Sequence, residues 1–155
     1  MLLRPRQKEL VNRVLTALHE HGNTLAVAPT GAGKTIMLSA AIGALCKAST
    51  AKTCVLAHRD ELTVQNETKF CRVNPHLSTG IFDASSKSWQ GDTTFAMVQT
   101  LSREHNLATM PKLDLLVIDE AHHARADSYV RIVNHAQSLN PVSYTHLTLP
   151  TNREV

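Results

Sequence analysis

Apolar residues in this chain form short uninterrupted runs that alternate with longer stretches suited to helices. The first stretch, residues 6–21, places its apolar residues on one face of a predicted amphipathic helix: Leu10, Val11, Val14, Leu15 and Leu18. Further helices are predicted over residues 36–45, 60–70 and 127–139. Short apolar runs predict buried strands over residues 24–28, 52–57, 93–98 and 113–118, with a weaker candidate over residues 77–82.

This alternation is typical of an α/β fold with a mainly parallel sheet and helices on both faces. In the last predicted helix we expect four residues to cover the sheet: Val130, Ile132, Val133 and Ala136. Residues 84–91 are rich in serine and are predicted to form a surface loop, in which Trp89 caps the edge of the core rather than stacking on nucleic acid. A length of 155 residues is enough for one domain with a sizeable core.

The turn between the first predicted strand and the next helix carries a phosphate-binding pattern. It reads APTGAGKT, a variant of the P-loop pattern G-x-x-x-x-G-K-[ST] in which Ala28 replaces the first glycine. Gly31 and Gly33 let the backbone bend, so that successive N–H groups and the positive helix end converge on phosphate oxygens. Lys34 adds a positive charge for the β- and γ-phosphates, and the Thr35 hydroxyl can ligate Mg²⁺. The predicted ATP-binding residues of this turn are Thr30, Gly31, Ala32, Gly33, Lys34 and Thr35.

Two carboxylates follow the strand predicted at residues 113–118. Asp119 and Glu120 come directly after that run, at the carboxyl end of a parallel strand, where ligands of open α/β sheets bind. We expect Asp119 to hold Mg²⁺ together with Thr35, while Glu120 orients and deprotonates the attacking water. An isolated Asp-Glu pair could instead begin a helix, whose dipole favours acidic residues there. The preceding P-loop favours catalysis, with Lys34, Asp119 and Glu120 as the catalytic residues.

Residues 119–122 read DEAH, and here the chain resembles a known family. It is similar to the first RecA-like domain of superfamily 2 helicases and translocases, in particular the DEAD/DEAH-box enzymes with a type III restriction Res-subunit domain. The resemblance covers residues 2–140, and the Ala28 variant is the one that helicase-type P-loops carry. It implies a RecA-like P-loop NTPase that uses ATP and Mg²⁺, and it gives His122 a role in coupling the ATP site to nucleic acid.

Further motifs of that family follow in the expected order. The start of the chain reads LRPRQ and resembles the family's opening motif, in which a glutamine, here Gln7, reads the adenine edge. Arg6 stands where the family has an aromatic residue, so a stacking role does not carry over to that position. Residues 55–62 resemble motif Ia, and residues 95–101 resemble the strand and turn that follow it. The resemblance implies nucleic-acid contacts from both segments: His58, Arg59, Gln99 and Thr100.

A complete enzyme of this family needs two RecA-like domains, and this chain has room for one. The family's arginine finger, which stabilises charge in the transition state and is worth orders of magnitude in rate, comes from the second domain. We therefore expect the chain alone to bind ATP weakly and to hydrolyse it poorly. The expected partners are nucleic acid, with DNA ahead of RNA, and the missing second RecA-like domain.

The C-terminal segment differs in character from the rest of the chain. From residue 142 it reads VSYTHLTLPT, which resembles one reading frame of the transposon-end adapter used to build shotgun sequencing libraries. We expect residues 142–155 to derive from that adapter and residues 1–141 to be a truncated helicase ATP-binding domain. The strand that natively bears motif III would then be missing, which would leave a sheet edge or pocket uncovered.

The same segment also resembles motif III, which reads approximately LTATP in the family. Residues 146–150 read HLTLP. Motif III needs a small residue between two hydroxyl residues so that it can lie against the DEAH histidine. Leu149 stands where the second hydroxyl belongs, and no alanine lies between, so the adapter interpretation is preferred.

Composition excludes several other classes of protein. The start lacks the apolar segment and cleavage site of a signal peptide, and no apolar stretch reaches membrane-spanning length, so no membrane partner is expected. Three scattered cysteines without metal-ligand spacing are consistent with reduced thiols, and we expect a cytoplasmic location. The nine histidines show no metal-binding pattern. A formal charge of +3 permits nucleic-acid binding without establishing it.

Two functions from different classes remain. The preferred one is the ATP-binding motor domain of a DNA helicase or translocase. The alternative is a noncatalytic ATP-dependent switch or binding module, which would keep the P-loop but need no motor partner. The native sequence downstream of residue 140 would discriminate between them, because only the motor requires motif III and a second domain.

Overall fold

The computed structural model describes residues 3–27, 33–48, 51–119, 127–139 and 143–148, with the backbone alone for residues 23–27, 47–48, 60 and 143–148. The described strands form one sheet in which every neighbouring pair is parallel. Their order across the sheet is β1-β6-β5-β2-β4-β3. The strands are β1 (Asn23–Val27), β2 (Thr53–Ala57), β3 (Thr79–Phe82), β4 (Thr93–Met97), β5 (Leu115–Asp119) and β6 (Ser143–Thr148).

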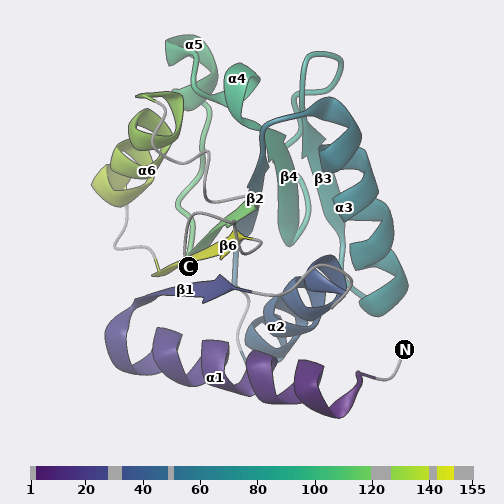
Figure 1. The fold of residues 1–155 in the computed structure, drawn as a ribbon. Coiled ribbons are helices and arrows are strands. Elements are labelled where there is room, and N and C mark those ends of the chain that lie inside the picture. The colour runs from purple at the N-terminus through teal and green to yellow at the C-terminus, as the bar shows by residue number, and fades with distance from the viewer. Residues whose placement is uncertain (1–2, 28–32, 49–50, 120–126, 140–142, 149–155) are drawn as a thin grey trace, which may run out of the picture.

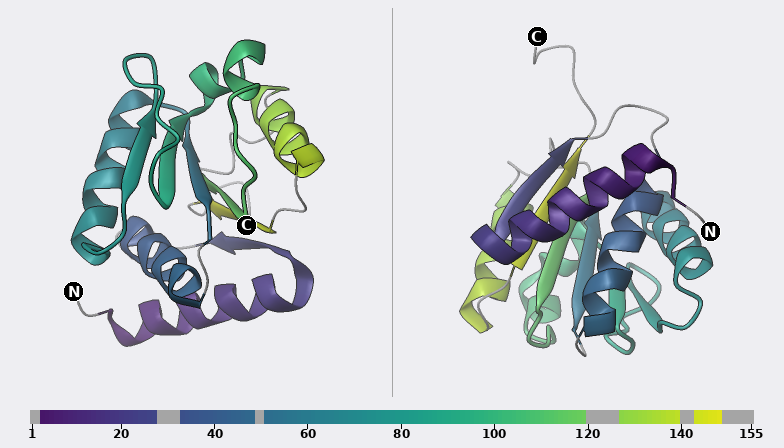
Figure 2. Two further views of the ribbon diagram at one scale, coloured as in Figure 1. Left: turned by 180° about the vertical axis from the view of Figure 1, so that it is seen from behind. Right: turned by 90° about the horizontal axis from the view of Figure 1, so that it is seen from below.

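Helices cover both faces of this sheet (Figures 1 and 2). One face carries α1 (Pro5–His21), α2 (Lys34–Ala48) and α3 (Asp60–Val73). The other face carries α4 (Val98–Leu101), α5 (Glu104–Leu107) and α6 (Asp127–Leu139). The α/β class, the mainly parallel sheet and the two helical layers predicted from the sequence are confirmed.

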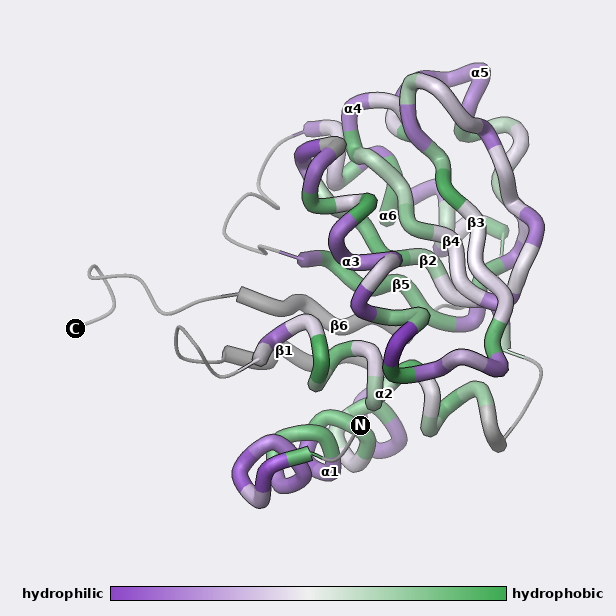
Figure 3. The backbone as a smooth tube through the Cα atoms, turned by 90° about the vertical axis from the view of Figure 1, so that its right-hand side faces the viewer, coloured by the Kyte–Doolittle hydropathy of each residue, from purple (hydrophilic) through white to green (hydrophobic). Residues whose placement is uncertain are grey.

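The two-residue period of the strands divides the core into two layers. In β2, Val55 packs with residues of α1, α2 and α3, whereas Cys54 and Leu56 pack with residues of α4, α5 and α6. In β5, Val117 packs with the layer of α1, α2 and α3, and Ile118 packs with the layer of α4, α5 and α6. Strands buried on both faces read as continuous apolar runs, and for this reason they were recognisable in the sequence. Figure 3 shows hydrophobic residues along β2 and β5 and alternating hydrophilic and hydrophobic residues along α1 and α3.

Most predicted helices and strands lie within a few residues of their expected bounds, but two short helices were not predicted. α4 and α5 are four residues long each, which is too short for a helical period to be visible in the sequence. The surface loop and the role of Trp89 are confirmed: its ring lies 5.1 Å from that of Phe82, and its Nε1 donates a hydrogen bond to Thr109 Oγ1 at 2.9 Å.

The prediction of which α6 residues cover the sheet is wrong at one position, Val130. Val130 is 48% exposed, whereas Tyr129, Ile132 and Ala136 are buried and Val133 packs partly against them. Positions 129, 132 and 136 follow the i, i+3, i+7 spacing of one helix face, and the tyrosine ring supplies the apolar surface that the prediction assigned to the valine.

The expectation that a sheet edge is left uncovered is wrong for this structure, whereas the origin of residues 142–155 stays a prediction. Residues 143–148 form β6, which pairs with β1 on one side and β5 on the other. Tyr144 lies opposite both Asn23 and Leu116. A parallel strand in this position needs only an extended backbone that pairs on both sides, and the segment contains tyrosine and threonine, which favour strands. A motif III sequence is therefore not required for β6 to form.

Candidate functional site

The site lies where three segments meet along the edge of the sheet at which the strands end. β1 leads towards the P-loop, α2 begins at its lysine, and β5 ends at its aspartate. Gly33 directly precedes α2, has a φ of 73°, and its carbonyl accepts the first-turn hydrogen bond from the Met37 N–H at 3.0 Å. A positive φ is readily adopted only by glycine, so the sequence places Gly33 where the backbone turns into the helix.

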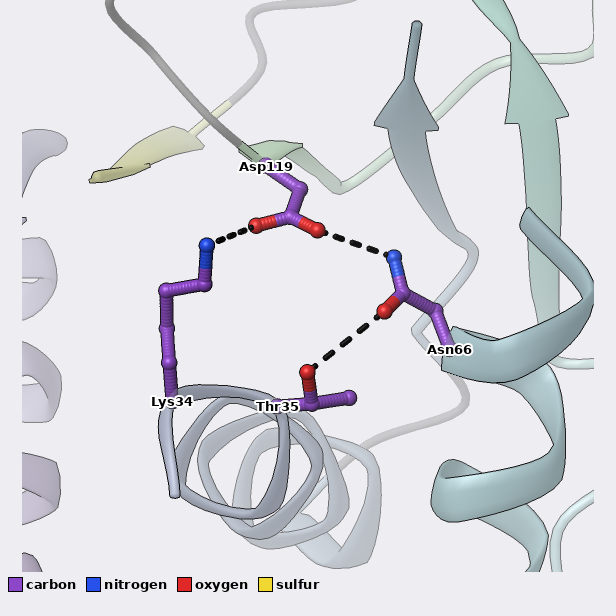
Figure 4. A network of polar contacts seen from close by, with 4 residues as sticks. All are labelled: Lys34, Thr35, Asn66 and Asp119. Atoms are coloured by element: carbon purple, nitrogen blue, oxygen red, sulfur yellow. Dashed lines mark hydrogen bonds and ion pairs between the residues drawn. The ribbon is translucent and has the colours of Figure 1, made fainter. Parts of the chain in front are cut away.

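Lys34 and Asp119 meet as a shielded ion pair (Figure 4). Lys34 Nζ lies 2.9 Å from Asp119 Oδ1, and the two side chains are 12% and 4% exposed. Both residues were predicted to serve the triphosphate and its metal, and they are 85 positions apart in the sequence (119 minus 34). Folding therefore brings the two halves of the predicted site into direct contact.

A residue that the sequence analysis missed joins the same network. Asn66, in α3, donates a hydrogen bond through Nδ2 to Asp119 Oδ2 at 3.0 Å. The Thr35 hydroxyl donates a hydrogen bond to Asn66 Oδ1 at 3.5 Å, which is the long limit for such a bond. Helical spacing in the sequence places Asn66 on the same face as the apolar Phe70 at i+4, but no local pattern identifies its partners.

Gln7, the predicted adenine-reading residue, lies close to Gly33. Its Oε1 accepts a hydrogen bond from the Arg4 backbone N–H at 2.8 Å, which orients the side chain at the start of α1. A Cβ atom added to Gly33 would stand only 2.6 Å from Gln7 Nε2. Any side chain at position 33 would therefore displace Gln7 as well as strain the backbone.

The four residues predicted to contact nucleic acid lie at one edge of the sheet. His58 and Arg59 follow β2, and Gln99 and Thr100 lie in α4 directly after β4; β2 and β4 are paired neighbours whose last residues, Ala57 and Met97, lie opposite each other. Arg59 and Gln99 are exposed. Thr100 is only 8% exposed, and its carbonyl accepts a hydrogen bond from Asn106 Nδ2 at 2.8 Å. A role in nucleic-acid binding stays a prediction for all four.

Five predicted site residues lie outside the described residues: Thr30, Gly31, Ala32, Glu120 and His122. The described ones fit a magnesium nucleotide. Thr35 offers a hydroxyl oxygen and Asp119 a carboxylate, the hard oxygen ligands that Mg²⁺ takes together with water and substrate phosphates. No cluster of three or more His, Cys, Asp or Glu suited to holding a metal occurs among the described residues.

Comparison with known proteins agrees with this geometry. The profile of the family described as "Type III restriction enzyme, res subunit" matches residues 1–146. The chain belongs to this family. The helicase-type domain expected from the sequence is thereby confirmed at the level of the family. Within the described residues, no helix is both long and apolar enough to span a bilayer.

Two relatives have names that assign them provisionally to the ATP-dependent helicases. IRC3 of Saccharomyces cerevisiae is 29% identical over 145 residues, which are 86% of this chain and 21% of that protein. The irc3 protein of Schizosaccharomyces pombe, whose name adds that it is mitochondrial, is 35% identical over 140 residues, which are 86% of this chain and 23% of that protein. This chain thus spans about a fifth of the length of these relatives.

A solved structure shows the same fold. The SWI2/SNF2 ATPase core of Sulfolobus solfataricus, in complex with double-stranded DNA, matches 99% of this chain and 33% of its own with a TM-score of 0.73 and 21% sequence identity. At that identity the likeness extends to the fold alone. The RecA-like arrangement predicted from the sequence is confirmed.

Proposed function

We propose that this chain is the ATP-binding motor domain of a helicase or translocase that acts on nucleic acid. The observation that carries the proposal is the 2.9 Å contact between Lys34, at the start of α2, and Asp119, at the end of β5. A lysine and an aspartate that meet beside Thr35 at this edge of a parallel sheet are the groups that a magnesium triphosphate requires.

Each described residue of the site has a role in this proposal. The backbone at Gly33 and the amino end of α2 bind phosphate oxygens, and Gln7 orients the adenine. Lys34 leaves Asp119 and binds the β- and γ-phosphates. The Asp119 carboxylate is then free to hold the metal with Thr35. Mg²⁺, when bound, would offset phosphate charge during phosphoryl transfer. Glu120 completes the site by taking a proton from the attacking water.

Nucleotide binding tests the proposal directly. A fluorescent ATP analogue titrated with Mg²⁺ is expected to bind the wild-type chain, and Lys34→Ala is expected to lose that binding. Lys8→Ala, an exposed lysine on α1, serves as the control. Equal affinity of the wild-type and Lys34→Ala chains would contradict the proposal, provided that circular dichroism shows both to be folded.

The partners follow from the same proposal. A second RecA-like domain would supply the arginine finger, so the chain alone is expected to hydrolyse ATP slowly even with DNA present. The DNA in the structural neighbour's complex supports DNA as the nucleic acid. Rapid DNA-stimulated hydrolysis by residues 1–155 alone would contradict the need for a partner domain.

The helicase names of the relatives disfavour a noncatalytic switch. The cytoplasm is retained as the proposed location, and only the Schizosaccharomyces pombe relative is named mitochondrial.

We also propose that residues 1–141 are native and that residues 142–155 derive from a sequencing adapter. The match between VSYTHLTLPT and one adapter reading frame supports this division. Sequencing genomic DNA downstream of the codon for residue 140 tests it. A genomic sequence that encodes VSYTHLTLPT would contradict the adapter origin.

A further inference from the structure

We propose that Asn66 is a positioning residue that holds Asp119 and Thr35 in the orientation in which they ligate Mg²⁺. This inference rests on the proposed ATP-binding function and adds to it a residue outside the P-loop and DEAH motifs. Asn66 reaches the site from α3, a helix that supplies none of the predicted phosphate or metal ligands.

The first argument is how the Asp119 carboxylate is held. Its Oδ1 contacts Lys34 Nζ, and its Oδ2 accepts the Asn66 hydrogen bond. When Lys34 turns to the phosphates, Asn66 remains as a donor that fixes the carboxylate. Asn66 and Asp119 are each 3% exposed, and in such a shielded place a hydrogen bond to a charged group is stronger than in water.

The second argument is the direction of the hydrogen bonds. An asparagine amide has a donor and an acceptor, and here the donor faces Asp119 while the acceptor faces Thr35. Because the Thr35 hydroxyl hydrogen points towards Asn66 Oδ1, lone pairs of the hydroxyl oxygen remain for a cation. One amide therefore prepares both predicted ligands, as residues behind metal ligands do in many sites.

The third argument is that Asn66 is held firmly in place. Phe70, one turn further along α3, is fully buried, with its ring 5.3 Å from that of Phe95. At the end of α3, Asn74 Nδ2 donates to the Ser39 carbonyl of α2 at 2.8 Å. A Cβ at Gly43 would lie 2.1 Å from Asn74 Oδ1, so only glycine permits this approach. The burial of Phe70 thus holds the turn of α3 that carries Asn66, while Asn74 anchors the far end of the helix, two turns away.

Asn66→Leu tests the inference, because leucine keeps the branched shape of asparagine but has neither donor nor acceptor. The readout is binding of a fluorescent ATP analogue to the 155-residue chain at increasing Mg²⁺. We expect the half-saturating Mg²⁺ concentration to rise by roughly tenfold or more, while affinity for the analogue in EDTA changes by less than about threefold. A residue that only supported the fold would shift both measurements together.

Asn74→Leu is the matched control, because Asn74 is also a buried asparagine of the same helix region, and its side-chain amide donates to the Ser39 carbonyl rather than to the site. Both variants are expected to melt at lower temperature, and only Asn66→Leu should change the Mg²⁺ dependence. An unchanged Mg²⁺ dependence in Asn66→Leu overturns the inference and leaves the proposed function standing. Failure of the wild-type chain to bind the analogue overturns the proposed function and the inference with it.

A measurement on the wild-type chain decides the matter if Asn66→Leu does not fold. The side-chain amide resonances of Asn66 are expected to shift when Mg²⁺ is added to the nucleotide complex, and those of Asn74 are expected to stay. Equal or absent shifts at the two asparagines would overturn the inference.

Discussion

At the scale of single residues, the Lys34–Asp119 ion pair stabilises the folded chain but also occupies the lysine that is proposed to bind phosphate. Each side chain is largely removed from water, and each offsets the desolvation of the other. In the proposed function, the same contact has to open before Lys34 can bind phosphate. The nucleotide-free site would then be stabilised by an interaction that nucleotide binding replaces.

Lys34→Ala is accordingly expected to lower the stability of the nucleotide-free chain. Removing one partner of a shielded ion pair leaves an uncompensated charge and costs about 3 kcal/mol. The double variant Lys34→Ala/Asp119→Asn should recover much of that loss, because the remaining side chain is neutral. Urea unfolding followed by circular dichroism measures the wild type, the single variants Lys34→Ala and Asp119→Asn, and the double variant. If the double variant loses the sum of the two single effects, the pair is not coupled as the structure indicates.

At the scale of elements, β2 is enclosed on both sides and on both faces of the sheet. It lies between β5 and β4, and all five of its residues are buried. Burial raises the pKa of the Cys54 thiol from about 9 to about 12, although the charge of Lys52 opposes part of the shift. The folded chain thus keeps the Cys54 proton at a pH at which the unfolded chain has lost it.

This difference predicts a loss of stability in alkali. Between pH 9 and pH 12 the unfolded state binds fewer protons at Cys54 than the folded state, so the free energy of unfolding falls as pH rises. Below pH 9 this contribution is fully present. Urea unfolding at several pH values should show a shallower fall for Cys54→Ala than for wild type. Leu101→Ala, which creates a cavity without removing a titrating group, should keep the wild-type slope.

The edge formed by the ends of β2 and β4 gives a second prediction at this scale. Arg59 precedes α3 and is exposed beside the segment that carries Gln99. Arg59→Ala should weaken binding to DNA of any sequence. It should also reduce the slope of the logarithm of the binding constant against the logarithm of the salt concentration by about one. Fluorescence anisotropy with a labelled single strand at several salt concentrations measures both.

Arg72→Ala offers a matched control, because Arg72 is an exposed arginine in the last turn of the same helix. It should leave DNA affinity close to wild type. Comparable losses in both variants would indicate general electrostatic attraction rather than a binding edge.

At the scale of the whole molecule, β6 connects the first strand to the rest of the sheet. β1 pairs with β6, and β6 pairs with β5, so the strand that leads to the P-loop and the strand that ends at Asp119 are joined through residues 143–148. The integrity of the proposed ATP site therefore depends on a segment near the end of the chain. This holds whatever the origin of that segment.

Deleting β6 should consequently disrupt the site as well as the sheet. A chain that ends at residue 142 leaves backbone groups of β1 and β5 without their strand partner, which is costly when they are buried. We expect a lower unfolding midpoint, a less cooperative transition and loss of nucleotide binding. A chain that ends at residue 148 keeps β6 and serves as the control. Equal midpoints for the two truncated chains would show that β6 contributes little.

The sequence by itself determined the alternation of strands and helices and the residues of the predicted phosphate-binding turn. Both are local: apolar runs and helical spacing identify the elements, and Gly33, Lys34 and Thr35 are consecutive. Only the tertiary structure decided that β6 separates β1 from β5 and that Asn66 joins Asp119 to Thr35. These relations depend on strand order and on the packing of α3 against α2. Such contacts link residues far apart in the chain, and no local pattern specifies them.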